Sequence, residues 1–162
     1  MNISLIHRRY FVIIVVCTLL ACSRFPDYSI DELLSTPEQI EINDREYILE
    51  TSLWRDFFPG PQAPPDGSPL IAVIYVVVTD SLPFPMSLDA DFLWVIKDGV
   101  DVWVTELEDD EMPTENYKLK KNAEGGPKWG PDIYVEAVVR IVDEGGNTHL
   151  LRAAAQPIGA TY

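Results

Sequence analysis

The residue best placed for chemistry is Cys22, whose thiol follows a small residue at the end of a short apolar run. That run, Tyr10–Ala21, comes directly after Arg8 and Arg9. Positive residues, a short apolar core and a small residue before the cut are typical of a signal peptide. A helix that spans a bilayer needs about 20 apolar residues, so we expect residues 1–21 to be removed and not retained.

The tetrapeptide LLAC that ends at Cys22 resembles the lipobox of bacterial lipoproteins. The resemblance implies that the thiol of Cys22 carries a diacylglycerol, that cleavage makes Cys22 the first residue, and that a further acyl chain such as palmitate is added to its amino group. Two or three acyl chains hold a protein firmly on a membrane, whereas one chain holds it weakly. Ser23 stands where many inner-membrane lipoproteins have aspartate, which implies the outer membrane if the host has two membranes.

Two other interpretations of this N-terminal segment stay open: a plain secretory signal beside a chance cysteine, or an apolar strand. If residues 1–21 are removed, 162 − 21 = 141 residues remain, which suits a single domain with a hydrophobic core. Cys17 would leave with the signal and Cys22 would be acylated. The lipoprotein interpretation therefore excludes a disulfide.

Net charge restricts the partners. The part after residue 21 keeps 10 of the 12 Lys and Arg and all 26 Asp and Glu, which gives 10 − 26 = −16. Nucleic-acid binding needs clustered Lys and Arg, and the local basic group is Lys118, Lys120 and Lys121 beside several carboxylates. We therefore expect no nucleic-acid partner and no attraction to anionic lipid headgroups.

Residues 22–38 are expected to form a lipidated tether. Pro26 and Pro37 bracket a segment in which Asp31–Leu34 fits one helical turn, and no longer helical period follows. The stretch 23–38 reaches at most about 55 Å when fully extended. The domain should therefore stay near its membrane.

Residues 39–162 alternate short β-type runs with turn clusters, which predicts an all-β domain. Two turns that contain glycine, Lys97–Gly99 and Asp143–Asn147, mark hairpins. Two packed antiparallel sheets, immunoglobulin-like in outline, fit these patterns best, without the Cys, Trp, Cys signature of antibody domains. The expected strands number about seven: Gln39–Ile42, Glu46–Phe57, Leu70–Thr79, Phe92–Ile96, Val100–Leu107, Asp132–Val142 and Thr148–Ala155.

Residue alternation predicts which strand faces are buried. In the sixth expected strand, every second residue from Ile133 to Ile141 is apolar, whereas Glu136 and Arg140 lie on the other face. The third expected strand, residues 70–79, is apolar on both faces. We expect it to be central and covered on its outer face by a loop.

Three short segments are similar to those of uncharacterised bacterial lipoproteins with a β-sandwich. They are LWRDF at residues 53–57, GGPKWG at residues 125–130 and LLRA at residues 150–153. The resemblance implies a fold and a location, and it implies no activity.

Catalytic chemistry has few candidates. The part after residue 21 contains one histidine, His149, and its thiol is assigned to lipid, so a serine or cysteine triad has little to build from. One histidine also makes a zinc or copper site unsuitable. The sequence contains no Gly-x-Ser-x-Gly, phosphate loop or dinucleotide fingerprint. We expect His149 to lie on the surface and the protein not to be an enzyme, with a hydrolase that uses two carboxylates left open.

Calcium is the one metal that the sequence could accommodate, because it takes about six to eight oxygen ligands in irregular loops. If the strands alternate in direction, the connections at residues 80–91 and 108–131 fall at the same end of the sandwich. The carboxylates that could then converge are Asp80, Asp89, Asp91, Asp109 and Asp110. The alternative is a solvated acidic loop, and otherwise we expect no cofactor.

Aromatic residues beside proline-rich turns form a candidate binding surface. Stiff loops lose little entropy on binding, so exposed rings there would anchor a protein or a glycan. The candidates are Trp54, Phe57, Phe58, Phe84 and Trp129. The alternative is that these loops fold back as lids over the ends of the sandwich.

Together these features predict a noncatalytic binding or scaffold lipoprotein of the cell envelope, with protein partners ahead of glycans. An envelope hydrolase would instead line a cleft with acidic side chains. A periplasmic inhibitor or chaperone-like sandwich would present a long unpaired edge strand.

Overall fold

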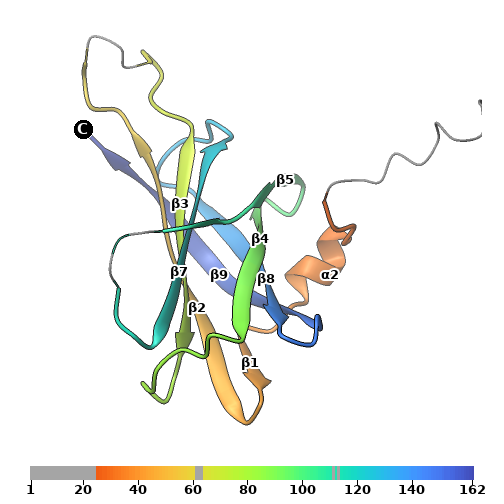
Figure 1. Cartoon of the computed structure of the whole chain (residues 1–162). Coiled ribbons are helices and arrows are strands. Elements are labelled where there is room, and N and C mark those ends of the chain that lie inside the picture. The colour runs from red at the N-terminus through yellow and green to blue at the C-terminus, as the bar shows by residue number, and fades with distance from the viewer. Residues whose placement is uncertain (1–24, 61–63, 111, 113) are drawn as a thin grey trace, which may run out of the picture.

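Strands dominate the structure, as the sequence predicts. The computed structural model describes residues 25–60, 64–110, 112 and 114–162 (Figure 1). The expected signal peptide, its cleavage site and Cys22 lie outside the described residues. The elements are α2 (Ile30–Leu34), β1 (Gln39–Ile42), β2 (Arg45–Asp56), β3 (Leu70–Val78), β4 (Leu88–Lys97), β5 (Asp101–Glu106), β6 (Glu108–Asp109), β7 (Lys118–Gly126), β8 (Tyr134–Asp143) and β9 (Thr148–Thr161). The predicted all-β class is confirmed.

The described strands form one continuous path, in the order β5-β4-β8-β9-β2-β3-β7-β6, with β1 added beside β2. The long strand β9 joins the two halves of this path. Its first part pairs antiparallel with β8 as far as Pro157, and its last part, Ile158–Thr161, pairs parallel with β2. A bend allows this change of partner, because Ala155 has φ +50° and the β8–β9 register shifts between Val135 and Ala137.

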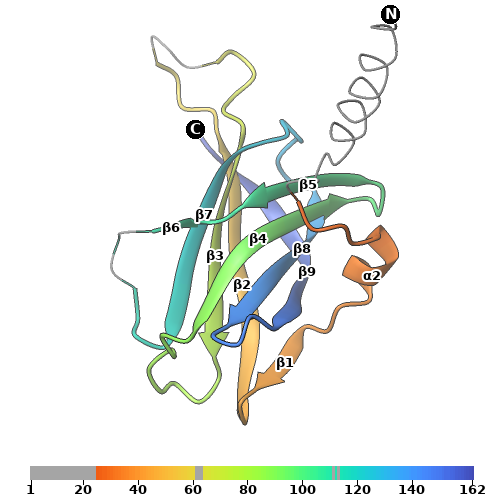
Figure 2. The same ribbon diagram turned by 45° about the vertical axis from the view of Figure 1, so that its right-hand side comes forward.

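The sheet curls until its two ends nearly meet (Figure 2). Trp103 of β5 lies so close to Gly126 of β7 that a Cβ on the glycine would come within 2.8 Å of the ring. Lys121 of β7 reaches Asp89 of β4, with 2.6 Å between Nζ and Oδ1. The described chain is therefore a nearly closed barrel of nine strands, whereas the sequence predicted about seven strands in two separate, immunoglobulin-like sheets.

The core lies inside the barrel and follows the predicted alternation. Val135, Ala137, Val139 and Ile141 of β8 are at most 2% exposed. Strand β3 is central, between β2 and β7. Of its outward residues, Ile71, Val73 and Tyr75 are half-buried and Val77 is buried. Full burial of a Val, Leu or Ile side chain contributes roughly 1.5–3 kcal/mol, so these inward faces supply most of the stabilisation.

Residues 25–38, expected to be a tether, pack on the outer face of the barrel (Figure 2). The predicted helical turn is present as α2, which begins with a capping box between Ser29 and Glu32. Leu33 is 1% exposed and packs with Trp94 and Val138 in a second apolar cluster. The apolar side chains of this short helix, Ile30, Leu33 and Leu34, are therefore part of the fold. None of the described helices is long and apolar enough to cross a bilayer.

Candidate functional site: an aromatic end held by a buried arginine

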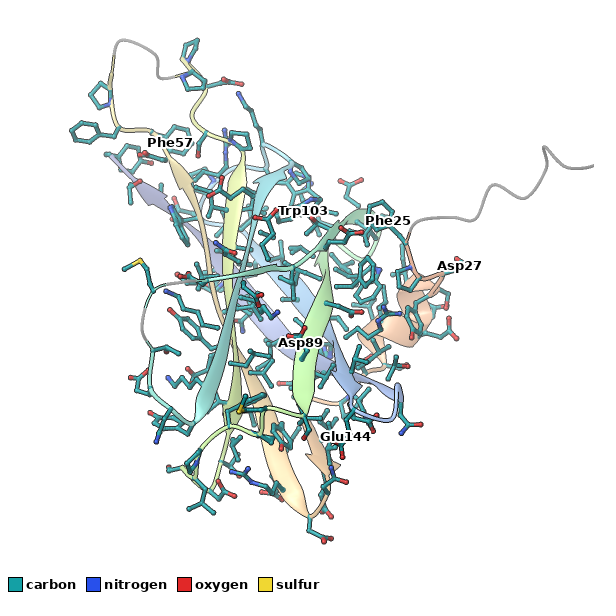
Figure 3. The ribbon with its side chains drawn as sticks, viewed as in Figure 1. Phe25, Asp27, Phe57, Asp89, Trp103 and Glu144 are labelled. Atoms are coloured by element: carbon teal, nitrogen blue, oxygen red, sulfur yellow. The ribbon has the colours of Figure 1, made fainter. Side chains whose placement is uncertain are left out.

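Four aromatic residues gather where β2 and β9 end and where the β2–β3 and β7–β8 connections meet. We term this group, Phe57, Phe58, Trp129 and Tyr162, the aromatic end. Figure 3 labels Phe57 there, far from Glu144 in the β8–β9 turn. The fold brings these residues together because β9 runs beside β2 as far as Thr161.

Arg55 of β2 is the side chain that organises this end, and it is only 4% exposed. Its Nε donates to the carbonyl of Ser68 at 2.8 Å, and Nη2 donates to the carbonyl of Asp66. Its Nη1 donates to the carbonyls of Lys128 and Trp129 at 3.2 and 3.0 Å. One guanidinium thus ties the β2–β3 connection to the β7–β8 connection. Hydrogen bonds that involve a charged group contribute about 1.5–3 kcal/mol each, so this link is strong.

Asp56, the next residue, holds the backbone on the face of β2 opposite to that of Arg55. Its Oδ1 accepts from the amide of Phe58 and from the hydroxyl of Thr161, both at 2.8 Å. These two hydrogen bonds lower the pKa of the Asp56 carboxyl. The amide of Asp56 donates to Oγ of Ser68 at 2.7 Å, and the amide of Ser68 donates to the Asp56 carbonyl at 2.7 Å. The backbone that leads into Phe58 is therefore held on both sides.

Within the aromatic end, Phe57 and Trp129 are half-buried, whereas Phe58 and Tyr162 form an exposed rim. Phe57 stacks on Tyr162 with 5.6 Å between ring centroids, and the guanidinium of Arg55 lies 4.8 Å from the Phe57 centroid. A Cβ on Gly67 would come within 2.6 Å of the Phe57 ring, so this position has no room for a side chain. Phe58 is 64% exposed and Tyr162 is 78% exposed. Exposed aromatic rings on a held backbone are the usual anchors of protein interfaces.

The other predicted aromatic residues are divided between the two ends. Trp129 is half-buried against the core within the aromatic end. Phe84, in the β3–β4 connection at the opposite end, packs edge-on against Tyr47 with 5.9 Å between centroids. Trp54 is half-buried on β2. Phe84 and Trp129 thus cover parts of the core, as expected if their loops fold back as lids. Phe58 is the predicted residue that does not pack on the core.

The five carboxylates considered for calcium do not form one cluster; each binds a cation of the protein. Asp89 and Asp109 both contact Nζ of Lys121 at 2.6 Å. The remaining pairs are Asp80 with Arg45, Asp91 with Arg140 and Asp110 with Lys120, at 2.9, 2.6 and 2.9 Å. Within the described ranges, no three His, Cys, Asp or Glu side chains are grouped for a metal ion.

Lys121 closes the gap between the two edges of the barrel. Its side chain is 5% exposed, whereas those of Asp89 and Asp109 are 61% and 87% exposed. Burial acts to lower the pKa of Lys121, but its hydrogen bonds to Asp109 and Asp89 outweigh burial and raise the pKa. Lys121, Asp109 and Asp89 therefore form a salt-bridge network that joins β7, β6 and β4.

His149 lies on β9 and faces the carboxylate of Asp143, with 3.8 Å between Nε2 and Oδ2. Its Nε2 is buried and has no hydrogen-bond partner among the described residues. Asp143 is engaged by Asn147, which donates from its backbone amide at 2.8 Å and from its side chain at 2.9 Å. These bonds lower the pKa of Asp143 and close the β8–β9 turn. Asn147 therefore holds Asp143 in the turn, and His149 lies beside it.

A hollow of about 630 Å³ lies on the outer face of β3 and β7 and is lined by Tyr75, Thr114, Glu115, Lys118 and Lys120. Lys118 forms an ion pair with Glu50 at 3.0 Å and lies 5.5 Å from the centroids of Tyr75 and Tyr117. The cation is thus already paired with a carboxylate and with rings. This hollow is the second candidate surface.

Comparison of this chain with protein-family models, with curated proteins and with solved structures finds no match.

Sequence reasoning missed two residues of this site, Tyr162 of the aromatic end and Arg55, which holds that end. A signal for Arg55 was present, because it continues the inward-facing series of Leu49 and Leu53 along β2. An arginine in a core register needs several acceptors, which indicates loops folded over it. Tyr162 had no comparable signal, since the sequence placed the end of the last strand at Ala155.

Proposed function

We propose that this protein is a lipid-anchored, noncatalytic binding protein of the bacterial cell envelope, which engages a protein partner through the aromatic end. The lipobox-like LLAC sequence supports an acyl anchor on Cys22. The outer membrane is the proposed location if the host has two membranes.

One observation carries the binding proposal: Arg55 is buried to hold two connections, while Phe58 and Tyr162 beside it are exposed. Burial of a cation is costly unless every donor finds an acceptor, and here main-chain carbonyls supply the acceptors. The fold thus includes a hydrogen-bonded internal brace next to an exposed aromatic surface. Prior ordering of that surface reduces the entropy lost when a partner binds.

A protein partner fits this surface better than a reaction does. The ion pair of Asp66 and Lys128, at 2.6 Å, joins the same two connections that Arg55 links, so this end carries a charged pair as well as the exposed rings of Phe58 and Tyr162. That arrangement is typical of protein interfaces. Two of the carboxylates, Asp91 and Asp110, are engaged by Arg140 and Lys120.

The test is in-cell crosslinking of the tagged full-length precursor, followed by mass spectrometry of the copurified proteins. The double variant Phe58→Ala, Tyr162→Ala should lose a partner that the wild type captures. Met86→Ala is the matched control, because Met86 is fully exposed in the β3–β4 connection at the opposite end. A partner that survives the double variant, or that Met86→Ala also removes, would contradict the proposal.

A further inference from the structure

The hollow on the outer face of β3 and β7 is built from three neighbouring strands and one connection. Glu50 of β2 pairs in register with Tyr75 of β3, and Tyr75 pairs with Lys120 of β7. Lys118 comes two residues before Lys120 and therefore shares its face of the strand. Two residues of the β6–β7 connection complete the lining, Thr114 and Glu115. The volume, about 630 Å³, suits a small ligand.

Two ion pairs hold the lysines of the hollow in place. Nζ of Lys118 lies 3.0 Å from Glu50, and Nζ of Lys120 lies 2.9 Å from Asp110. The side chains of Lys118 and Lys120 are 16% and 12% exposed, so both are largely fixed by the protein. An ammonium has three N–H donors, and a lysine that contacts one carboxylate keeps donors for a ligand. The hollow therefore presents ordered hydrogen-bond donors.

The charges around the hollow nearly balance, which restricts the class of ligand. Two ammonium groups face three carboxylates, which gives 2 − 3 = −1; the groups are Lys118, Lys120, Glu50, Asp110 and Glu115. This balance does not favour a strongly charged ligand of either sign. An apolar ligand is also unsuitable, because it would cover charged groups without bonding to them. Hydroxyl groups fit, since each one both donates and accepts.

Tyrosine rings add an apolar surface to these polar groups. Tyr75 is half-buried and lines the hollow. Nζ of Lys118 lies 5.5 Å from the ring centroids of both Tyr75 and Tyr117. The face of an aromatic ring carries partial negative charge, so it attracts the polarised C–H groups of a sugar ring. A pyranose sugar, with hydroxyl groups at its edge and C–H groups on its faces, matches both features.

The hollow lies across the barrel from the N-terminal segment. Phe25 contacts Phe92 of β4 with 6.0 Å between centroids, and Tyr28 contacts Trp94 of β4 at 5.4 Å. Strands β4 and β7 belong to different halves of the strand order, and Figures 1 and 2 show α2 and β7 on opposite sides. Three residue steps from Cys22 to Phe25 span at most about 11 Å. An anchor at Cys22 would therefore bring the outer face of β4 to the membrane and leave the hollow open.

We propose that this hollow is a binding site for an uncharged carbohydrate. Lys118 and Lys120 donate hydrogen bonds to its hydroxyl groups, and Glu115 accepts from them. The ring of Tyr75 contacts one face of a sugar unit. The site is separate from the aromatic end and requires neither the proposed protein partner nor the proposed anchor.

The test titrates the full-length protein with neutral tetrasaccharides of glucose, mannose and N-acetylglucosamine, one at a time. The protein is purified in a detergent that has no sugar headgroup, so that the detergent does not compete. Amide NMR shifts report binding and its position. We expect one or more of these sugars to bind with a Kd of about 1 mM or lower. The shifted amides should be those of Tyr75 and residues 114–120, with the amides of β4 and β5 unchanged.

A matched pair of variants tests the role of the lysine. Lys118→Met should weaken sugar binding by about tenfold or more, because a charged hydrogen-bond donor is lost. Lys97→Met is the control, since Lys97 also forms ion pairs, with Asp98 and Asp101 at 3.3 and 3.5 Å, on the β4–β5 hairpin. It should bind sugar as the wild type does. Thermal unfolding of both variants checks that they are folded, and the wild-type shifts locate the site even if one variant is not.

Three results would overturn the proposal. The first is that none of the three sugars binds, or that the shifts centre on the aromatic end. The second is that Lys118→Met binds sugar as tightly as Lys97→Met. The third is that an acidic sugar, oligogalacturonate, binds more tightly than the neutral sugars, which would exclude an uncharged ligand.

Discussion

Replacing Arg55 with methionine removes the brace of the aromatic end and keeps most of the buried stem. The guanidinium donates to the carbonyls of Ser68, Asp66, Lys128 and Trp129. Asp66 and Lys128 are exposed, so water can replace two of these donors, whereas Ser68 and Trp129 are half-buried. An unsatisfied buried carbonyl costs about 1–3 kcal/mol, so we expect a loss of about 3 kcal/mol. That corresponds to a fall in Tm of roughly 10 °C.

The assay combines urea unfolding with hydrogen exchange. Arg55→Met should lower the unfolding midpoint and speed exchange of the Ser68 amide, which now donates to the Asp56 carbonyl. Arg45→Met is the matched control, because Arg45 binds Asp80 and two carbonyls at the other end of the barrel. It should cost less stability and leave Ser68 exchange unchanged. A variant of Arg55 as stable as the wild type, or a loss spread evenly over both ends, would refute this account of the brace.

Three further predictions follow from neighbouring contacts. Gly67→Ala should destabilise the protein by about 1–2 kcal/mol more than Gly146→Ala in urea unfolding, since both glycines have φ near +80° but only the first lies against Phe57. Equal losses would exclude the ring contact. Lys121→Met should cost about 1 kcal/mol near pH 7, because two exposed carboxylates lose a buried cation. The wild type should lose the same contribution as pH rises above 10.5, since the folded pKa is raised from that value. Asp56 has a folded pKa below 3.8, so its contribution is complete above that pH and is lost on further acidification. Asp56→Asn should therefore flatten the acid limb of thermal stability against pH, and an unchanged limb would contradict this.

Strands with a clear apolar period were predictable. β3 is apolar at nearly every position, and β8 alternates from Val135 to Ile141, so both were expected within two residues of their bounds. β7 was missed because its sequence, KLKKNAEGG, contains three lysines and lacks the apolar alternation that predicts a strand. Lys121 points inward with its ammonium on two carboxylates, and no local pattern reveals those distant partners.

The barrel shape was not predictable for a related reason. It depends on β9, which continues past a bend at Ala155 and pairs with a second strand, β2. Pro157 predicts the end of a strand, since proline has no amide hydrogen to donate to the hydrogen bonds between strands. The register shift beside it allows pairing to resume at Ile158.

The candidate site was predictable in part. Residue type identified Phe57, Phe58 and Trp129, because aromatic rings beside turns are common anchors. Sequence could not show that Phe84 packs at the opposite end, nor that Tyr162 stacks on Phe57. The spacing of Ile30, Leu33 and Leu34 suits one helix face, and that pattern could have indicated that residues 25–38 pack on the barrel.

The most direct test of the central claim is photo-crosslinking in cells from an amino acid placed at position 58, with position 86 as the matched site. The account predicts one envelope protein crosslinked from position 58 and not from position 86, with the product lost in Cys22→Ala and weakened in Arg55→Met. The same product from both sites, or from position 58 in chains without the anchor, would contradict it.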